Sequence, residues 1–351
     1  RYMLERAREA HSARLVPVAA VTIGLAGAEL VDFEEMAAAG AGLFSDDGIP
    51  IDRADVLRDA LRKAAHAGLA ISLHEEDRML TGHGACHAGR VAERLGVAGI
   101  PIQAESARVR RDLEVAAAVG GQVHIAHVST AESLELIRAA RERGLNVTCE
   151  ATPHHFSLTD EAFARRGPNA KMAPPLRSSR DSEALCAGLA DGAIDVIATD
   201  HAPHDPASKQ MERLERLFDG VDEAARLSAA EAAILSEAAN GIVGLETALG
   251  LALALVHRGV IDATRLVTLM SSNPARLLRC EGGKLTAGSR ADITVIDSTL
   301  QWTVEAAAMR SLSRNTPFSG IRLTGAAVMT MVEGSIVYER NGTRGASAKS
   351  G

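Results

Sequence analysis

Aromatic residues and cysteine are scarce in this sequence of 351 residues, and the 38 basic residues are outnumbered by 45 acidic ones. Phe, Trp and Tyr make up 3% of it, which argues against an all-β sandwich and suits helices packed on a parallel sheet. The formal net charge of −7 gives no indication of the basic surface that binds nucleic acid. There is no run of about 18 apolar residues, so we expect no membrane span.

The four cysteines are scattered along the chain without a Cys-x-x-Cys pair, at Cys86, Cys149, Cys186 and Cys280. This spacing indicates neither a zinc ribbon nor a disulfide framework. The first residues show no signal-peptide pattern. We therefore expect a cytoplasmic protein with reduced thiols. With 46% hydrophobic residues, the chain is long enough for one large domain or two smaller ones.

Short apolar runs alternate with helical patterns, which predicts parallel strands joined by crossover helices. The expected strands are 15–22, 42–45, 70–74, 122–127, 146–150 and 194–199. The expected helices between them are 31–39, 53–66, 105–119, 131–143 and 180–190. The pattern predicts an α/β fold, a TIM-type (β/α)8 barrel of which strands 3–8 are recognisable. A doubly wound sheet would alternate similarly, but no Gly-x-Gly-x-x-Gly follows a strand.

The two ends of the chain differ in character from this middle part. The sequence begins at Arg1 in a helical pattern, and we expect the N-terminal strands of the barrel to be missing from it. Residues 1–280 are predicted to form the barrel, and 281–345 a small β-sandwich appendage. A polar insert at 205–239 is predicted to be helical, either as a surface element or as a lid.

The run from Ile197 to His204 is the most informative stretch of the chain. It begins as an apolar strand and ends in an acid, two histidines and a proline. Because side chains alternate along a strand, Val196, Ala198 and Asp200 are expected to point the same way. This places a carboxylate at the carboxyl end of a buried strand, where barrel enzymes keep their active sites. The alternative interpretation is a turn that happens to be rich in His and Asp.

Other expected strands also end in metal-ligand residue types, at Asp46 and Asp47, at His74 and at His127. With Asp200, two imidazoles and two carboxylates would meet at one mouth of the barrel, as a catalytic divalent metal requires. This donor set suits zinc, with manganese or cobalt as alternatives.

Each of these residues also has a purely structural interpretation. His74 could be a structural histidine, and the two aspartates could cap a turn or the next helix. His124 and His127 lie three positions apart and face opposite ways on a strand. We choose His127 as the ligand because it is next to the strand end, and expect His124 to be packed or hydrogen-bonded.

A histidine pair at a further strand end, His154 and His155, is a candidate for supporting contacts to the metal ligands.

Several motifs together resemble the bacterial dihydroorotases of the amidohydrolase superfamily. They are 44–48 (FSDDG), 127–130 (HVST), 150–155 (EATPHH), 174–177 (PPLR), 198–204 (ATDHAPH), 241–247 (GIVGLET), 273–276 (NPAR) and 315–318 (NTPF). The resemblance covers nearly the whole chain. The run 198–204 separates it from hydantoinases and allantoinases, which resemble it less there.

The resemblance implies two zinc ions in the complete protein and a role for each predicted ligand. Asp47 would bridge the two ions, since the second aspartate keeps the family's spacing to His74. His74 and His127 would bind the second zinc. Asp200 would bind the first zinc and act as general acid and base.

For the substrate, the resemblance implies that His204 holds a carboxylate and that the backbone near Asn240 and Gly241 contacts the ring. Two departures from the family pattern are visible. The first-strand His-x-His, the arginine after it and an asparagine on the second strand are absent. Ala173 stands where the family usually has asparagine, and a methyl group cannot replace the hydrogen bonds of that amide.

The implied activity is the reversible ring closure of N-carbamoyl-L-aspartate to dihydroorotate in pyrimidine (UMP) synthesis, with a small molecule as substrate. Two alternatives remain open. One is a non-catalytic subunit that supports an aspartate transcarbamoylase, and the other is a cyclic amidohydrolase acting on hydantoin or allantoin. A homo-oligomer or an association with aspartate transcarbamoylase is equally open.

Overall fold

The computed structural model describes residues 1–218 and 225–340. Its centre is a parallel sheet in the order β1-β2-β3-β6-β7-β8. The strands are β1 (Val18–Ala19), β2 (Leu43–Phe44), β3 (Ile71–Leu73), β6 (Val123–Ile125), β7 (Val147–Ala151) and β8 (Val196–Ile197). Each lies within, or within one residue of, a strand expected from the sequence, and neighbours in the sheet follow chain order. The sheet forms the curled half-barrel that the predicted fold class requires.

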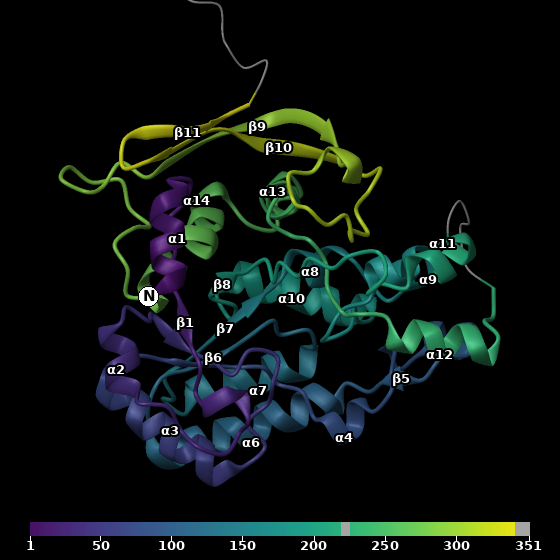
Figure 1. The fold of residues 1–351 in the computed structure, drawn as a ribbon, viewed down its shortest axis with the longest axis horizontal. Coiled ribbons are helices and arrows are strands. Elements are labelled where there is room, and N and C mark those ends of the chain that lie inside the picture. Colours follow the sequence, from purple (N-terminus) through teal and green to yellow (C-terminus); the bar gives the residue numbers. More distant parts are fainter. Residues whose placement is uncertain (219–224, 341–351) are drawn as a thin grey trace, which may run out of the picture.

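Helices cover the outer face of this sheet, and Figure 1 shows α3, α6 and α7 side by side there. They are α2 (Phe33–Ala38), α3 (Ala54–Ala67), α6 (Gln103–Val119), α7 (Ala131–Glu142) and α10 (Ser179–Asp191). Helix α3 illustrates why they pack in this way. Its buried residues Val56, Leu57, Ala60, Leu61 and Ala64 recur at helical spacing and form one apolar face.

The main hydrophobic core lies between these helices and the sheet. Leu57, Ile71, Ile125 and Ile137 within it are fully buried. Because this core holds the strands from outside, their carboxyl ends are free to present polar residues at the mouth of the half-barrel.

A second core lies beyond β3 and was not expected from the sequence. It involves a two-stranded parallel sheet, β4 (Cys86–His87) with β5 (Gly99–Ile100). Around it lie α4 (Arg78–Thr81), α5 (Arg90–Leu95), α9 (Glu161–Arg166) and the 3-10 helix Gly167–Ala170, whereas α8 (Pro153–Ser157) packs against α10 and contributes Phe156 to the main core. Leu95 and Phe163 pack here with Leu214 and Leu235 of the polar insert. The insert is helical as predicted, with α11 (Met211–Phe218) and α12 (Ala229–Glu237), and 219–224 lie outside the described residues.

The C-terminal helices pack at the β8 end of the half-barrel and contribute to the main core, and the C-terminal sheet lies beyond them (Figure 1). Its helices are α13 (Ala248–His257), α14 (Ala263–Val267) and α15 (Asn273–Leu277), with a π-helical turn at Thr268–Ser272. An antiparallel sheet follows in the order β11-β10-β9, from β9 (Ile293–Thr303), β10 (Arg322–Val332) and β11 (Ser335–Glu339). Helix α13 packs against β10. The division at 280/281 stays a prediction, and 341–345 lie outside the described residues.

The remaining elements are α1 (Tyr2–Ala10) and the 3-10 helices Ile23–Leu25 and Ala306–Ala308. Within the described residues, no helix combines the length and apolar character needed to cross a membrane.

Candidate metal and substrate site

The four predicted metal ligands each follow a different strand of the half-barrel. Asp47 comes after β2, His74 after β3, His127 after β6 and Asp200 after β8. Three of them have a left-handed backbone, with φ of 35° at Asp47, 33° at His127 and 46° at Asp200. Positive φ is uncommon for residues other than glycine, and such strained positions cluster at functional sites. The backbone is therefore unusual at the positions where the sequence predicts ligands.

Two of these ligands are in direct contact. His74 Nδ1 lies 2.7 Å from His127 Nε2. Burial and the neighbouring His127 lower the pKa of His74 to about 4, and burial also lowers the pKa of His127. Both imidazoles are therefore neutral at pH 7, which is the form that binds a metal.

The two adjacent aspartates have different environments. Asp46 is buried, and its Oδ1 accepts hydrogen bonds from the amides of Val21 (2.8 Å) and Thr22 (2.9 Å). The Thr22 hydroxyl donates to the other oxygen of Asp46. Asp47 has a side chain that is 91% exposed, and its Oδ1 lies 3.8 Å from His74 Nε2. Asp46 thus braces the end of β1, while the carboxylate of Asp47 remains available at the mouth.

Asp200 lies within electrostatic range of the other ligands without a direct contact to them. Burial, and then the nearby carboxylates of Glu150 and Asp47, raise its pKa to about 6, while His74 opposes this shift. A carboxyl group with a pKa near the working pH is well suited to accept and return a proton.

The prediction that Asp200 continues the side-chain alternation of the strand was wrong. Strand β8 ends at Ile197, so the alternation of side chains does not extend to Asp200. The left-handed turn at Asp200 sets its direction instead.

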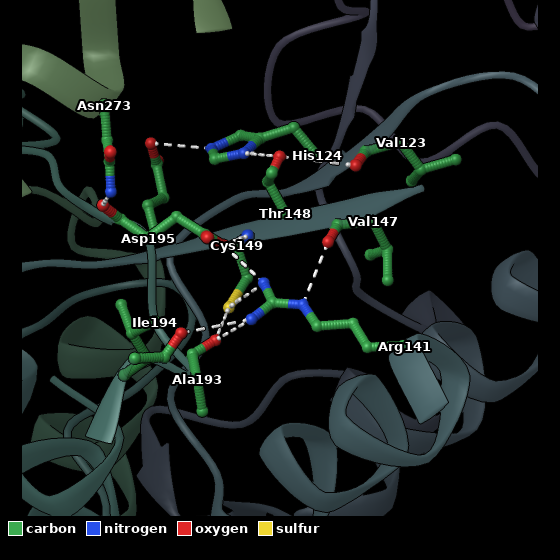
Figure 2. A network of polar contacts seen from close by, with 12 residues as sticks. Val123, His124, Arg141, Val147, Thr148, Cys149, Ala193, Ile194, Asp195 and Asn273 are labelled. Atoms are coloured by element: carbon green, nitrogen blue, oxygen red, sulfur yellow. Dashed lines mark hydrogen bonds and ion pairs between the residues drawn. The ribbon is translucent and has the colours of Figure 1, made fainter. Parts of the chain in front are cut away.

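Glu150, at the end of β7, belongs to this site and was not predicted as a site residue. Its Oε1 accepts a hydrogen bond from the amide of His127 (3.4 Å), and its Oε2 lies 3.0 Å from His124 Nε2. The Nδ1 atom of His124 in turn lies 2.9 Å from the Thr148 hydroxyl (Figure 2). Burial raises the pKa of Glu150, but the His124 hydrogen bond and the nearby imidazoles outweigh this and leave it below its ordinary value. His124 is hydrogen-bonded, as predicted.

The histidine pair that follows β7, His154 and His155, is buried. His155 is held by the Thr152 hydroxyl (2.7 Å) and the carbonyl of Pro174 (2.9 Å). His154 is 1% exposed, and its Nε2 has no hydrogen-bond partner among the described residues. Burial, followed by the charges of His155 and His127, lowers the pKa of His154 well below its ordinary value.

The predicted substrate contacts come together at another part of the mouth. Gly241 has φ of +150°, and a Cβ there would lie 2.7 Å from His204 Cδ2 and 2.8 Å from the carbonyl oxygen of Ala202. Only glycine allows this close approach. Asn315 ties the same backbone together, donating to Ala202 O (2.9 Å) and Gly241 O (3.0 Å) and accepting from the His204 amide (3.2 Å). The neighbouring Asn240 is exposed.

The residues present fit a divalent metal by their chemistry. Two neutral imidazoles and two carboxylates are the donors that such ions prefer. The unpartnered Nε2 of His154 also marks a place where a polar group is lacking. By themselves, the described residues bring no three His, Cys, Asp or Glu side chains close enough to enclose an ion. Asp47, His74 and His127 are linked pairwise, and Asp200 stands apart.

Comparison with known proteins identifies the family. A family model described as dihydro-orotase-like matches residues 1–133. A dihydroorotase from Citrifermentans bemidjiense is 43% identical over 338 residues, which is 96% of this chain and 74% of that protein. One from Anaeromyxobacter dehalogenans is 44% identical over 339 residues, covering 96% of this chain and 73% of that protein. The chain belongs to the dihydroorotase family. It is accordingly related to metal-dependent cyclic amidohydrolases, as the motifs predicted.

Solved structures agree on the fold of this dihydroorotase family member. An L-hydantoinase (dihydropyrimidinase) from Arthrobacter aurescens superposes with a TM-score of 0.79 at 28% identity, covering 96% of this chain and 73% of that one. A D-hydantoinase from Bacillus sp. AR9 superposes with a TM-score of 0.75 at 22% identity, covering 96% and 73%. The predicted barrel class is confirmed by these neighbours.

Proposed function

We propose that the chain acts as a dihydroorotase, interconverting N-carbamoyl-L-aspartate and dihydroorotate. The observation that carries this proposal is the placement of Asp47, His74, His127 and Asp200 at four strand ends, in a chain 43–44% identical to curated dihydroorotases. We further propose zinc as the metal, two ions per site, and a place in cytoplasmic pyrimidine synthesis.

In this proposal Asp47, His74, His127 and Asp200 hold the metal. When bound, the metal supplies a Lewis acid that polarises the cyclic amide carbonyl and makes water more acidic. In ring opening, Asp200 accepts the proton of the attacking water and returns it to the ring nitrogen that leaves. A carboxylate beside the metal is a suitable group for both steps. Ring closure runs the same transfers in reverse.

His204 and the Asn240–Gly241 backbone would hold the substrate. His204 would bind the substrate carboxylate, with its ring kept in place against Gly241. The Asn240–Gly241 backbone would contact the ring amide. Ala173 offers only a methyl group toward the substrate, which is the feature that favours a different cyclic amide.

A hydantoinase-like activity is the second candidate, supported by Ala173 and by the hydantoinase neighbours in the structural comparison. The higher identity to dihydroorotases favours dihydroorotate. A ring-opening assay on dihydroorotate, hydantoin and allantoin, with and without added zinc, decides between them. We expect zinc-dependent turnover of dihydroorotate above the other two. Preference for hydantoin or allantoin would contradict the proposal, and loss of all turnover in the zinc-loaded protein would favour a non-catalytic subunit of an aspartate transcarbamoylase.

A further inference from the structure

Two lysines are buried outside the proposed metal ligands. Lys171 follows the 3-10 helix Gly167–Ala170 and is 3% exposed, and Lys209 precedes α11 and is 1% exposed. In the described part of the chain, the hydrogen bonds of both ammonium groups go only to backbone carbonyls. A buried cation that is satisfied in this way fixes the positions of the carbonyls around it.

Two of the carbonyls that Lys209 binds belong to the segment between α12 and α13. Its Nζ donates to Ala239 O (2.8 Å) and Gly241 O (2.9 Å), and more weakly to Lys171 O (3.3 Å). The Gly241 amide completes the contact by donating to Lys171 O (2.9 Å).

Lys171 binds carbonyls that come slightly earlier in the chain, at the end of α12 and just after it. Its Nζ donates to Ser236 O and to Ala238 O, each at 2.6 Å. Together the two ammonium groups hold the carbonyls of Ser236, Ala238, Ala239 and Gly241. Residues 236–241 are therefore fixed by two side chains from distant parts of the chain.

Regular secondary structure does little to fix this segment. Helix α12 ends at Glu237, and α13 begins only at Ala248. Among the described residues, the isolated bridge between His201 and Ile242 is the only strand-like pairing between these two helices. The segment contains Asn240 and Gly241, and Gly241 packs against His204. The lysines thus hold carbonyls of the backbone segment that would meet the substrate.

Keeping two cations here has an energetic cost. Burial lowers the pKa of Lys171 to about 8, and burial with the nearby charge of Lys171 lowers the pKa of Lys209 to about 7. Apolar side chains of similar length would fill the same space without this cost, but they could not hold the carbonyls.

We propose that Lys171 and Lys209 are positioning residues that fix the Asn240–Gly241 backbone against His204 and so set the affinity for a cyclic amide substrate bearing a carboxylate. This inference rests on the proposed function for the identity of the substrate. The lysines do not touch the reacting atoms. Their effect passes through the backbone of Gly241.

The test compares Lys209→Met with Arg141→Met. Arg141 is a matched control because it also holds backbone carbonyls, donating to Val147 O (3.0 Å) and Ala193 O (2.8 Å) (Figure 2). These carbonyls lie at the amino ends of β7 and β8, away from the mouth. Both variants lose a cation that binds main-chain oxygens, so both are expected to unfold at lower denaturant concentration.

Only Lys209→Met should change the affinity for the substrate. We expect its KM for dihydroorotate to rise about fivefold or more, with kcat within about twofold and bound zinc unchanged, since a uniform binding contact is weakened. Hydrogen exchange at the amides of 239–243 should accelerate in the same variant. An unchanged KM, or an equal KM change in Arg141→Met, would overturn the inference. If Lys209→Met does not fold, Lys171→Met is expected to show the same split and is judged by the same criteria.

Failure of the proposed function can be distinguished from failure of the positioning role. Turnover by the unsubstituted protein tests the function, whereas the affinity of each variant relative to it tests the positioning role. Calorimetric binding of dihydroorotate to the chelator-treated proteins measures that affinity without turnover. A variant that binds as tightly as the unsubstituted protein would refute the positioning role whatever the turnover result.

Discussion

Replacing Asp200 with asparagine is expected to stabilise the metal-free protein while abolishing its activity. The pKa of the Asp200 carboxyl is about 6 in the folded protein against an ordinary value of 3.8, because of burial and the carboxylates of Glu150 and Asp47. An acid whose pKa is raised by folding binds more protons folded than unfolded between these two values. The contribution of Asp200 to the free energy of unfolding therefore falls as pH rises from about 4 to about 6.

The size of this effect follows from the two pKa values. Their difference corresponds to about 3 kcal/mol, which is the cost of keeping Asp200 charged above pH 6. The asparagine side chain carries no charge, so the variant avoids this cost. At pH 7.5 we expect Asp200→Asn to exceed the unsubstituted protein in free energy of unfolding by up to about 3 kcal/mol, with no gap near pH 4.

Urea denaturation of chelator-treated protein at pH 4 and pH 7.5 measures the gap. Asp59→Asn is the control, because Asp59 is exposed and its ion pair with Arg62, at 3.3 Å, is a surface pair. It should change the free energy of unfolding by less than about 0.5 kcal/mol at either pH. An Asp200→Asn variant that is equally or less stable at pH 7.5, or a gap independent of pH, would refute the reasoning.

Three further predictions concern the same site. Asp46→Ala should lower the free energy of unfolding by about 2–5 kcal/mol, because it leaves the amides of Val21 and Thr22 unpaired. Asp47→Asn should instead mainly lower the amount of bound metal. Equal metal loss in the two variants, measured by elemental analysis, would contradict this distinction. His204→Ala should raise KM more than it lowers metal content, and steady-state kinetics with metal analysis would show the reverse if His204 were a ligand. Chelation should abolish turnover and zinc should restore it, so chelator-resistant turnover would rule out a metal-dependent reaction.

The sheet could be predicted because its strands are apolar and separated by amphipathic helices. Helix α3 shows this, since five of its residues at helical spacing form the buried face. The exact ends of the strands were harder to predict from the sequence. The prediction for Asp200 assumed an extended backbone to that residue, but β8 stops at Ile197.

The second core could not be predicted, because its strands are too short to show a period. Strand β4 comprises Cys86–His87 and β5 comprises Gly99–Ile100. Their pairing depends on residues from α9 and α11 that come much later in the chain.

Supporting polar residues of the site gave no signal of their own either. Glu150 and Asn315 lie in motifs that the resemblance included, but nothing in their spacing showed what they bind. Lys171 and Lys209 act on carbonyls, which every residue carries, so only the folded chain reveals their partners.

The central claim is that Asp47, His74, His127 and Asp200 bind a shared metal centre. Anomalous diffraction at the zinc edge, from crystals of the zinc-loaded protein, tests it most directly. Anomalous peaks are expected about 2.0–2.2 Å from the ligand atoms of all four residues. Peaks that lie elsewhere, or a zinc-loaded crystal with no peak at this mouth, would contradict it.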